Sequence, residues 1–343
     1  IRARWTRKVP AAKTKPGLGR VARRFVVIAV VLALIVGEIG LTASSSTAWF
    51  LTFPLPRNAL AKDESTAITS VGAIDCQPSL PDAYASCLFT HKPGQSMTFY
   101  LWVPAQASPS DRYPLVLLLH GGGERADPKQ SAAANEQTIL SDPYVEVWGP
   151  GYPSLDAVAV QQQWPSFIVV PQVVIPNRWV NVPASTGSYK LSAKPSTSLQ
   201  MAHEIVEALL QMFSGIDRNR LYVTGLSMGG YGTWEMIERW PGLFAAAAPL
   251  SGAGDPALAG RIKNLPIWAF HNTGDPIVPV SGSRDMIAAI KAAGGHPLYT
   301  ELPGDEHDSW LTAYGIGSGP NNVAAEFYNW LFSQRKGAPA ASG

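Results

Sequence analysis

Cysteine is scarce in this chain, since its 343 residues include only Cys76 and Cys87. Two thiolates are too few to complete a tetrahedral zinc site by themselves, so we expect no metal. If the chain is exported, one even pair favours a single disulfide that closes a short loop. Two free buried thiols are the alternative.

Positive charge is also scarce, outside the first 61 residues. Residues 1–61 hold ten of the 27 Lys and Arg residues but only one acid, Glu38, which leaves 17 basic and 24 acidic side chains in residues 62–343. A body with a net charge of −7 repels nucleic acid, so we expect no nucleic-acid partner. Phosphate-loop and repeat folds are excluded as well, because no glycine-rich loop continues into Gly-Lys-Ser/Thr and no internal repeat is visible.

Long hydrophobic runs are lacking too. The longest, 25–36, is shorter than the roughly 20 apolar residues of a membrane span but suits a signal-peptide core of roughly 7–15 residues. Nine Lys and Arg precede it, and small residues at 46–48 and 59–61 suit a signal peptidase. An uncleaved anchor over 25–43 is the alternative. Both interpretations place the body outside the cytoplasm, and any membrane contact would come only through this segment.

A serine motif stands at the centre of the chain. The stretch 225–229, Gly-Leu-Ser-Met-Gly, fits G-x-S-x-G and follows a short apolar strand at 221–223, while 230–240 has a helical pattern. A strand that turns sharply into a helix needs glycines on both sides, and it holds the serine hydroxyl out at the end of a sheet. This setting suits Ser227 as a nucleophile.

Apolar runs and helical patterns alternate through the rest of the chain, which indicates an α/β fold with a mostly parallel sheet and helices on both faces. We expect one catalytic domain over 62–337, with an insertion at 125–165, and a disordered tail at 338–343. Strands are expected at 84–90, 97–103, 115–119, 167–170, 244–250, 267–270 and 298–302, and helices at 198–213, 283–293 and 323–335.

A serine nucleophile needs a base and a group that orients the base, and in such sheets these follow later strands. His307 comes after the strand at 298–302 and Asp275 after the strand at 267–270, which gives the order Ser-Asp-His of the α/β-hydrolase fold. Asp255 is the best alternative acid. Among the other histidines, His120 and His271 are expected to be structural, while the remaining three lie in a helix or near turns. The acids at 305 and 308 flank His307, and direct sequence neighbours rarely have the geometry to orient a ring.

Three glycines follow the expected strand at 115–119, in the run His120-Gly-Gly-Gly-Glu124. Bare backbone there allows N–H groups to face a ligand, so an oxyanion hole is expected from the N–H groups of Met228 and Gly122. His120 is expected to hold this loop, and Glu124 to have a structural role. Substrate contacts are expected from Gly123, Trp148, Trp179 and Trp310.

Four motifs, in this order, resemble the secreted phospholipase/carboxylesterase-type α/β-hydrolases, which include polyhydroxybutyrate-depolymerase-like and feruloyl-esterase-like enzymes. They are the stretches 113–124, 225–234, 274–279 and 307–310, and the resemblance runs from about Leu88 to Arg335. It implies an esterase with Ser227, Asp275 and His307 as its triad and no cofactor. This chain departs from the family in having Asn272 after His271, where Gly is usual, and in a longer insertion.

The expected function is therefore an exported serine carboxylesterase that acts on a small-molecule or polymeric ester. One alternative is a depolymerase of polyhydroxyalkanoate or aromatic polyester, or a feruloyl or acetyl-xylan esterase. A second is a peptidase similar to prolyl oligopeptidase, although no propeller domain is visible. A third is a binding protein on a hydrolase fold, which the complete set of serine, acid and histidine disfavours.

Overall fold

The computed structural model describes residues 72–77, 83–104, 110–150, 160–316 and 323–337, all within the unit Arg57–Gly343. The expected leader or anchor, the tail 338–343 and Tyr152 of the insertion lie outside the described residues. Among the residues that are described, no helix has the length and apolar character that crossing a membrane requires.

One mixed sheet organises the described part of the chain. Its strands are β1 (Ala73–Cys76), β2 (Ala85–Lys92), β3 (Gln95–Trp102), β4 (Tyr113–Leu119), β5 (Phe167–Pro171), β6 (Ile216–Leu226), β7 (Ala246–Leu250), β8 (Trp268–Asn272) and β9 (Leu298–Leu302), in the order β1-β2-β3-β5-β4-β6-β7-β8-β9. The pairs from β5 through β4, β6 and β7 to β9 are parallel, and the pairs that involve β1, β2 and β3 are antiparallel. The expected mostly parallel sheet is confirmed.

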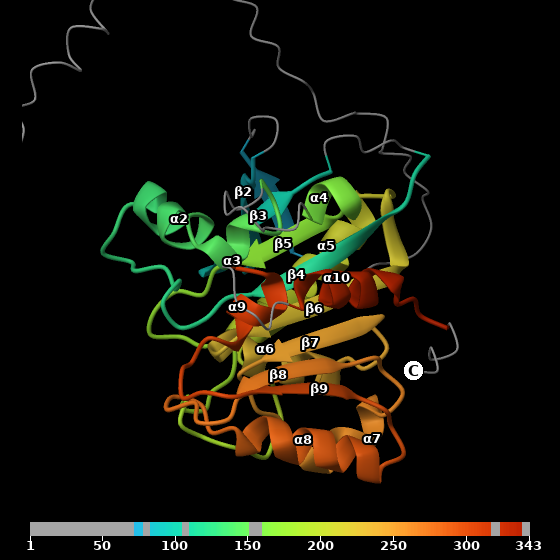
Figure 1. Cartoon of the computed structure of the whole chain (residues 1–343). Helices are drawn as coiled ribbons and strands as arrows, with labels where there is room; N and C mark the ends of the chain where they lie inside the picture. Colours follow the sequence, from blue (N-terminus) through green and yellow to red (C-terminus); the bar gives the residue numbers. More distant parts are fainter. Residues whose placement is uncertain (1–71, 78–82, 105–109, 151–159, 317–322, 338–343) are drawn as a thin grey trace, which may run out of the picture. The chain divides into compact units, whose positions relative to one another are not determined.

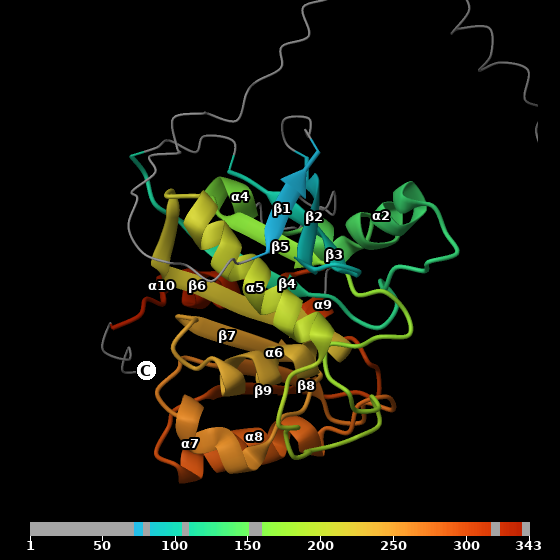
Figure 2. The same ribbon diagram turned by 180° about the vertical axis from the view of Figure 1, so that it is seen from behind.

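Helices cover both faces of this sheet. They are α2 (Ala132–Leu140), α3 (Pro143–Glu146), α4 (Val160–Gln163), α5 (Thr197–Met212), α6 (Met228–Arg239), α7 (Ala259–Ile262), α8 (Ser281–Ala292), α9 (Ser309–Tyr314) and α10 (Ala324–Ser333), with a 3-10 turn η2 (Pro256–Leu258) before α7. Figure 1 shows α9 and α10 in front of one face, and Figure 2 shows α5 and α6 in front of the other.

The alternation of side chains along β4 explains why the chain has two apolar cores. Leu115, Leu117 and Leu119 are buried against apolar residues of α5, α6 and α8. Val116 and Leu118 point the other way and are buried with residues of α9 and α10. The continuous apolar run at 115–119 therefore marks a strand that is covered on both sides.

Three local expectations need correction. The insertion at 125–165, for which no helix was expected, contains α2, α3 and α4 in its described part. Strand β1, and helix α9, which begins two residues after His307, were also not among the expected elements.

The disulfide expected between Cys76 and Cys87 is present. The two residues are direct partners in the antiparallel pairing of β1 with β2, with Cα atoms 4.0 Å apart. The bond therefore ties an edge strand to the sheet, on the side away from β9.

Candidate active site

Ser227 occupies the turn between β6 and α6 in a strained backbone conformation, with φ 53° and ψ −116°. A non-glycine residue in this region costs on the order of 1–3 kcal/mol and persists only where the surroundings impose it. Those surroundings are close-packed. A Cβ atom added at Gly225 would lie 2.6 Å from the Leu119 carbonyl oxygen, and one added at Gly229 would collide with the same carbonyl. The glycines of the motif thus allow the turn to press against the end of β4.

His307 lies in the loop between β9 and α9, and its ring contacts both other members of the expected triad. Its Nε2 lies 2.8 Å from the Ser227 Oγ, and its Nδ1 lies 2.6 Å from the Asp275 Oδ2. A carboxylate only accepts hydrogen bonds, so the Nδ1 carries the proton. In the neutral ring the Nε2 is then an acceptor for the serine hydroxyl. The structure brings Ser227, Asp275 and His307 together in one hydrogen-bonded chain.

The Asp275 carboxylate has no exposed surface and is held at both oxygens. Its Oδ1 accepts the backbone N–H groups of Ile277 and Val278, each at 2.9 Å. Burial acts to raise the pKa of this carboxyl, but the hydrogen bonds from His271, His307 and these two N–H groups outweigh it and hold the pKa well below its ordinary value. Asp275 is therefore ionised throughout the neutral range.

A second histidine, the fully buried His271, supports the same carboxylate. Its Nε2 lies 3.0 Å from the Val278 carbonyl oxygen and 3.4 Å from the Asp275 Oδ2, and its Nδ1 lies 2.8 Å from the Ser283 Oγ. The ring has no exposed surface. Sequence reasoning expected His271 to be structural, and the missed feature is its contact with Asp275 four residues later.

The rival residues have other partners. The Asp255 carboxylate accepts the backbone N–H groups of Leu191 and Ala257. His91 pairs with Glu204, and His203 stacks on Trp240 with ring centroids 4.0 Å apart. None of these contacts leads to Ser227, whereas His307 reaches it directly.

The glycine loop after β4 is anchored by His120. The His120 Nε2 accepts the backbone N–H of Val173, so the Nδ1 carries the proton that is donated to the Gly121 carbonyl at 2.7 Å. Burial lowers the pKa of His120 to about 4, so the ring is neutral at physiological pH. The Trp179 indole N–H donates to the His120 carbonyl at 2.9 Å and fixes the same point of the backbone.

The loop passes close to the serine turn and then opens to solvent. A Cβ atom added at Gly121 would lie 2.8 Å from the Leu226 side chain, which shows how near the loop comes to β6. Gly122 and Gly123 are exposed, and a Cβ atom added at either would meet nothing within 4 Å. Arg125, which sequence reasoning did not single out, donates from its Nε to the Gly122 carbonyl at 2.9 Å and orients that peptide.

The four expected substrate contacts divide into two pairs. Trp148 and Trp179 have no exposed surface, so neither offers a face to a substrate and both need correction. Trp148 fills an aromatic core with Tyr314 and Tyr328. Gly123 is exposed, and Trp310 is partly exposed with its ring edge-on to His307 at 5.1 Å between centroids.

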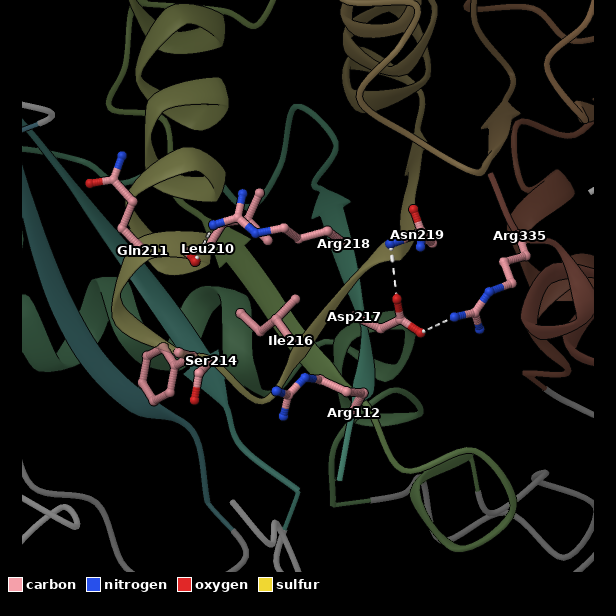
Figure 3. Close-up of a pocket in the computed structure, with 10 residues that line it drawn as sticks. Arg112, Leu210, Gln211, Ser214, Ile216, Asp217, Arg218, Asn219 and Arg335 are labelled. Carbon is pink, nitrogen blue, oxygen red and sulfur yellow. Dashed lines mark hydrogen bonds and ion pairs between the residues drawn. The ribbon is translucent and has the colours of Figure 1, made fainter. Parts of the chain in front are cut away.

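One hollow of about 640 Å³ lies elsewhere, at the opposite end of β4 and β6 (Figure 3). Arg112, Arg218 and Arg335 line it, and each contacts a protein oxygen: the Asp111 carbonyl, the Leu210 carbonyl and the Asp217 carboxylate respectively. Because these arginines are engaged within the protein, we assign the hollow no part in the chemistry.

No family model matches the chain. A crystal structure of a thermostable esterase superposes with a TM-score of 0.61 and 34% identity, covering 75% of this chain and 64% of that one. Esterase LipQ of Mycobacterium tuberculosis is 32% identical over 103 residues, which is 30% of this chain and 23% of the relative. The bifunctional acetylxylan esterase/xylanase XynS20E of Neocallimastix patriciarum is 22% identical over 190 residues, which is 55% of this chain and 23% of the relative.

The chain therefore has the α/β-hydrolase fold, and the resemblance to esterases that its motifs predicted is confirmed. It spans about a quarter of the length of the two curated relatives and 64% of the thermostable esterase chain.

Proposed function

We propose that this chain is a serine carboxylic-ester hydrolase in which Ser227 is the nucleophile, His307 the general base and Asp275 the orienting acid. The observation that carries the proposal is the continuous chain of contacts from the Asp275 Oδ2 through His307 to the Ser227 Oγ, at 2.6 Å and 2.8 Å. The strained turn that presents Ser227, and the buried ionised carboxylate behind His307, support the same assignment.

In the first half of the reaction, His307 accepts the Ser227 proton at Nε2 as Oγ attacks the ester carbonyl. The imidazolium that forms is stabilised by Asp275, which keeps its negative charge. His307 then returns the proton to the departing alcohol as the ester C–O bond breaks, and an acyl-enzyme remains on Ser227. In the second half, water loses a proton to His307 and attacks the acyl group, and the acid is released as Ser227 regains its proton.

Two backbone N–H groups would bind the oxyanion of the tetrahedral intermediate. Met228 is the first residue of α6, where an N–H has no partner within the helix. Gly122 lies in the open part of the glycine loop and directly follows Gly121, where an added Cβ atom would lie 2.8 Å from the Leu226 side chain. Neither donor depends on a side chain, and no metal or organic cofactor takes part in this scheme.

Gly122→Pro tests the second donor, because proline has no N–H. We expect kcat/KM for a short p-nitrophenyl ester to fall by about 10²–10³, the usual effect of losing one oxyanion donor. Gly122→Ala is the matched control, since it keeps the N–H and its Cβ enters open space. Equal activity of the two variants would remove the Gly122 N–H from the oxyanion hole.

A substrate series tests the ester assignment itself. We expect turnover of p-nitrophenyl acetate, butyrate and octanoate, and little turnover of matched peptide p-nitroanilides, because an aromatic amine is a poorer leaving group than p-nitrophenolate. Preferential cleavage of the p-nitroanilides would favour a peptidase, and no turnover together with no labelling by a fluorophosphonate would favour a binding protein.

Esters of plant cell-wall polysaccharides are a second candidate substrate. The sequence similarity to an acetylxylan esterase/xylanase over 190 residues favours them. Release of acetate from acetylated xylan, or of ferulate from feruloylated xylan, would support this candidate. Products from insoluble polyester would instead support a depolymerase, and activity limited to small soluble esters would oppose both.

We also propose that the catalytic body acts outside the cytoplasm. The disulfide between Cys76 and Cys87 supports this, because such bonds persist in oxidising compartments. The basic and then apolar sequence at 1–36 supports it too, whether the segment is removed or anchors the body.

A further inference from the structure

The loops that carry Asp275 and His307 leave the carboxyl ends of two neighbouring parallel strands, β8 and β9. Two backbone hydrogen bonds, both 2.8 Å, join the loops at their start: the Thr273 N–H donates to the Leu302 carbonyl, and the Gly274 N–H donates to the Gly304 carbonyl. Beyond Gly304 the chain is irregular up to the start of α9 and has exposed residues at 305 and 306. The ladder of the sheet therefore does not set the position of His307.

A side-chain hydrogen bond crosses between the two loops at this point. The Asn272 Nδ2 donates to the Asp308 Oδ1 at 3.1 Å. Asn272 is the last residue of β8 and is buried, with 4% of its surface exposed. Its partner is the residue directly after His307. The bond thus joins the base of the acid loop to the backbone that carries the histidine.

The side chain of Asp308 does not cap α9, although Asp308 lies at the cap position of this helix. Asp308 precedes the first residue of α9, where an aspartate normally accepts a backbone N–H of the first helical turn. Its side chain makes no such capping hydrogen bond. Its Oδ1 instead accepts the hydrogen bond from the Asn272 amide, so Asp308 connects the two loops and does not cap the helix.

We propose that Asn272 is a positioning residue of the hydrolase: through Asp308 it holds His307 at the distance from Asp275 and Ser227 that proton transfer requires. The proposal rests on the function proposed above for the triad.

Other contacts limit how far the structure changes when the hydrogen bond between Asn272 and Asp308 is lost. The next residue, Ser309, is buried and its Oγ lies 2.9 Å from the Ser251 Oγ, so the start of α9 stays attached without Asn272. We therefore expect the fold to survive the loss of the bond, while the irregular segment that includes His307 gains freedom. Misplacement of a reacting group by about 1 Å costs up to about 10² in rate, and a partial loss of order should cost about tenfold.

Steady-state kinetics on the full chain with p-nitrophenyl butyrate test the proposal. Asn272→Ala and Asp308→Ala are each expected to lower kcat about tenfold with KM changed less than about twofold, because neither side chain is proposed to bind the substrate. The double variant should also lose about tenfold rather than about a hundredfold, since both substitutions remove the same contact.

Asp308→Asn is the matched control for charge. It removes the negative charge beside His307 but keeps a carbonyl oxygen as acceptor for Asn272, so its kcat should stay within about twofold of the parent chain. An unchanged kcat in both alanine variants, even with a lower thermal unfolding temperature, would show a purely structural bond and overturn the proposal. Multiplicative losses in the double variant, or a loss in Asp308→Asn equal to that in Asp308→Ala, would also overturn it. Failure of the proposed function is distinct, because the unsubstituted chain would then not hydrolyse the ester.

Discussion

Ser227→Ala is expected to lower kcat for p-nitrophenyl butyrate by about 10⁵–10⁶, the loss typical of removing the nucleophile from a serine triad. The substitution leaves His307 and Asp275 in place but removes the atom that attacks the carbonyl. Residual turnover would come only from water bound near the backbone donors.

The fold should not change in Ser227→Ala. The side-chain oxygen of Ser227 contacts His307, whereas the turn itself is held by backbone bonds, including the Ser227 N–H to the Leu250 carbonyl at 2.9 Å. Alanine at this φ is strained to a similar degree as serine, so we expect the same circular dichroism and a thermal midpoint within about 2 °C of the parent. A loss of 1 kcal/mol would lower the midpoint of a domain of about 150–250 residues by about 2–4 °C. A variant that keeps more than a tenth of the parent kcat would exclude Ser227 as the nucleophile.

Asp275→Asn is expected to lower kcat by about 10⁴, as for the corresponding change in other serine triads. The Oδ1 of residue 275 accepts two backbone N–H groups, so an asparagine must keep its oxygen there and turn its NH₂ group toward His307. That NH₂ donates to the Nδ1 and moves the ring proton to the Nε2. The Nε2 then cannot accept the Ser227 proton.

The loss of thermal stability in Asp275→Asn, relative to the parent chain, should be larger at neutral pH than at acidic pH. Because the pKa of Asp275 is depressed in the folded protein, its carboxylate contributes stability above the unfolded pKa of about 3.9, and the contribution fades as the pH falls toward the lower folded value. The variant should thus unfold at a lower temperature than the parent at pH 7, and the difference should shrink toward pH 3. A difference that is constant over pH 3–8, measured by calorimetry, would contradict this account of the carboxylate.

The parts of the fold with strong local patterns could be predicted from the sequence. The apolar run at 115–119 and the glycines at 225 and 229 correspond to β4 and to the tight turn, because burial on two faces and close backbone approach each demand particular residues. The short elements could not be predicted from the sequence. Strand β1 has four residues with alternating exposure, and α9 has six residues beside the site.

Two signals in the insertion could have been used. Ser131 caps α2 and Asp142 caps α3, with a proline directly after Asp142, which is a common start of a helix. For Trp148 and Trp179, by contrast, the sequence offers no usable signal, because an aromatic residue in a loop looks the same in sequence whether it lines a cleft or fills a core. The approach of His271 to Asp275, and of Asn272 to Asp308, depends on tertiary packing that periodicity does not encode.

Covalent labelling tests the central claim most directly. The full chain and His307→Ala would be treated with a fluorophosphonate, digested and analysed by peptide mass spectrometry. The account predicts a single adduct on Ser227 in the parent chain, formed at least about 10³ times faster than in His307→Ala, because a serine hydroxyl without its base is a weak nucleophile. No adduct, an adduct on another residue, or labelling that is equally fast without His307 would contradict it.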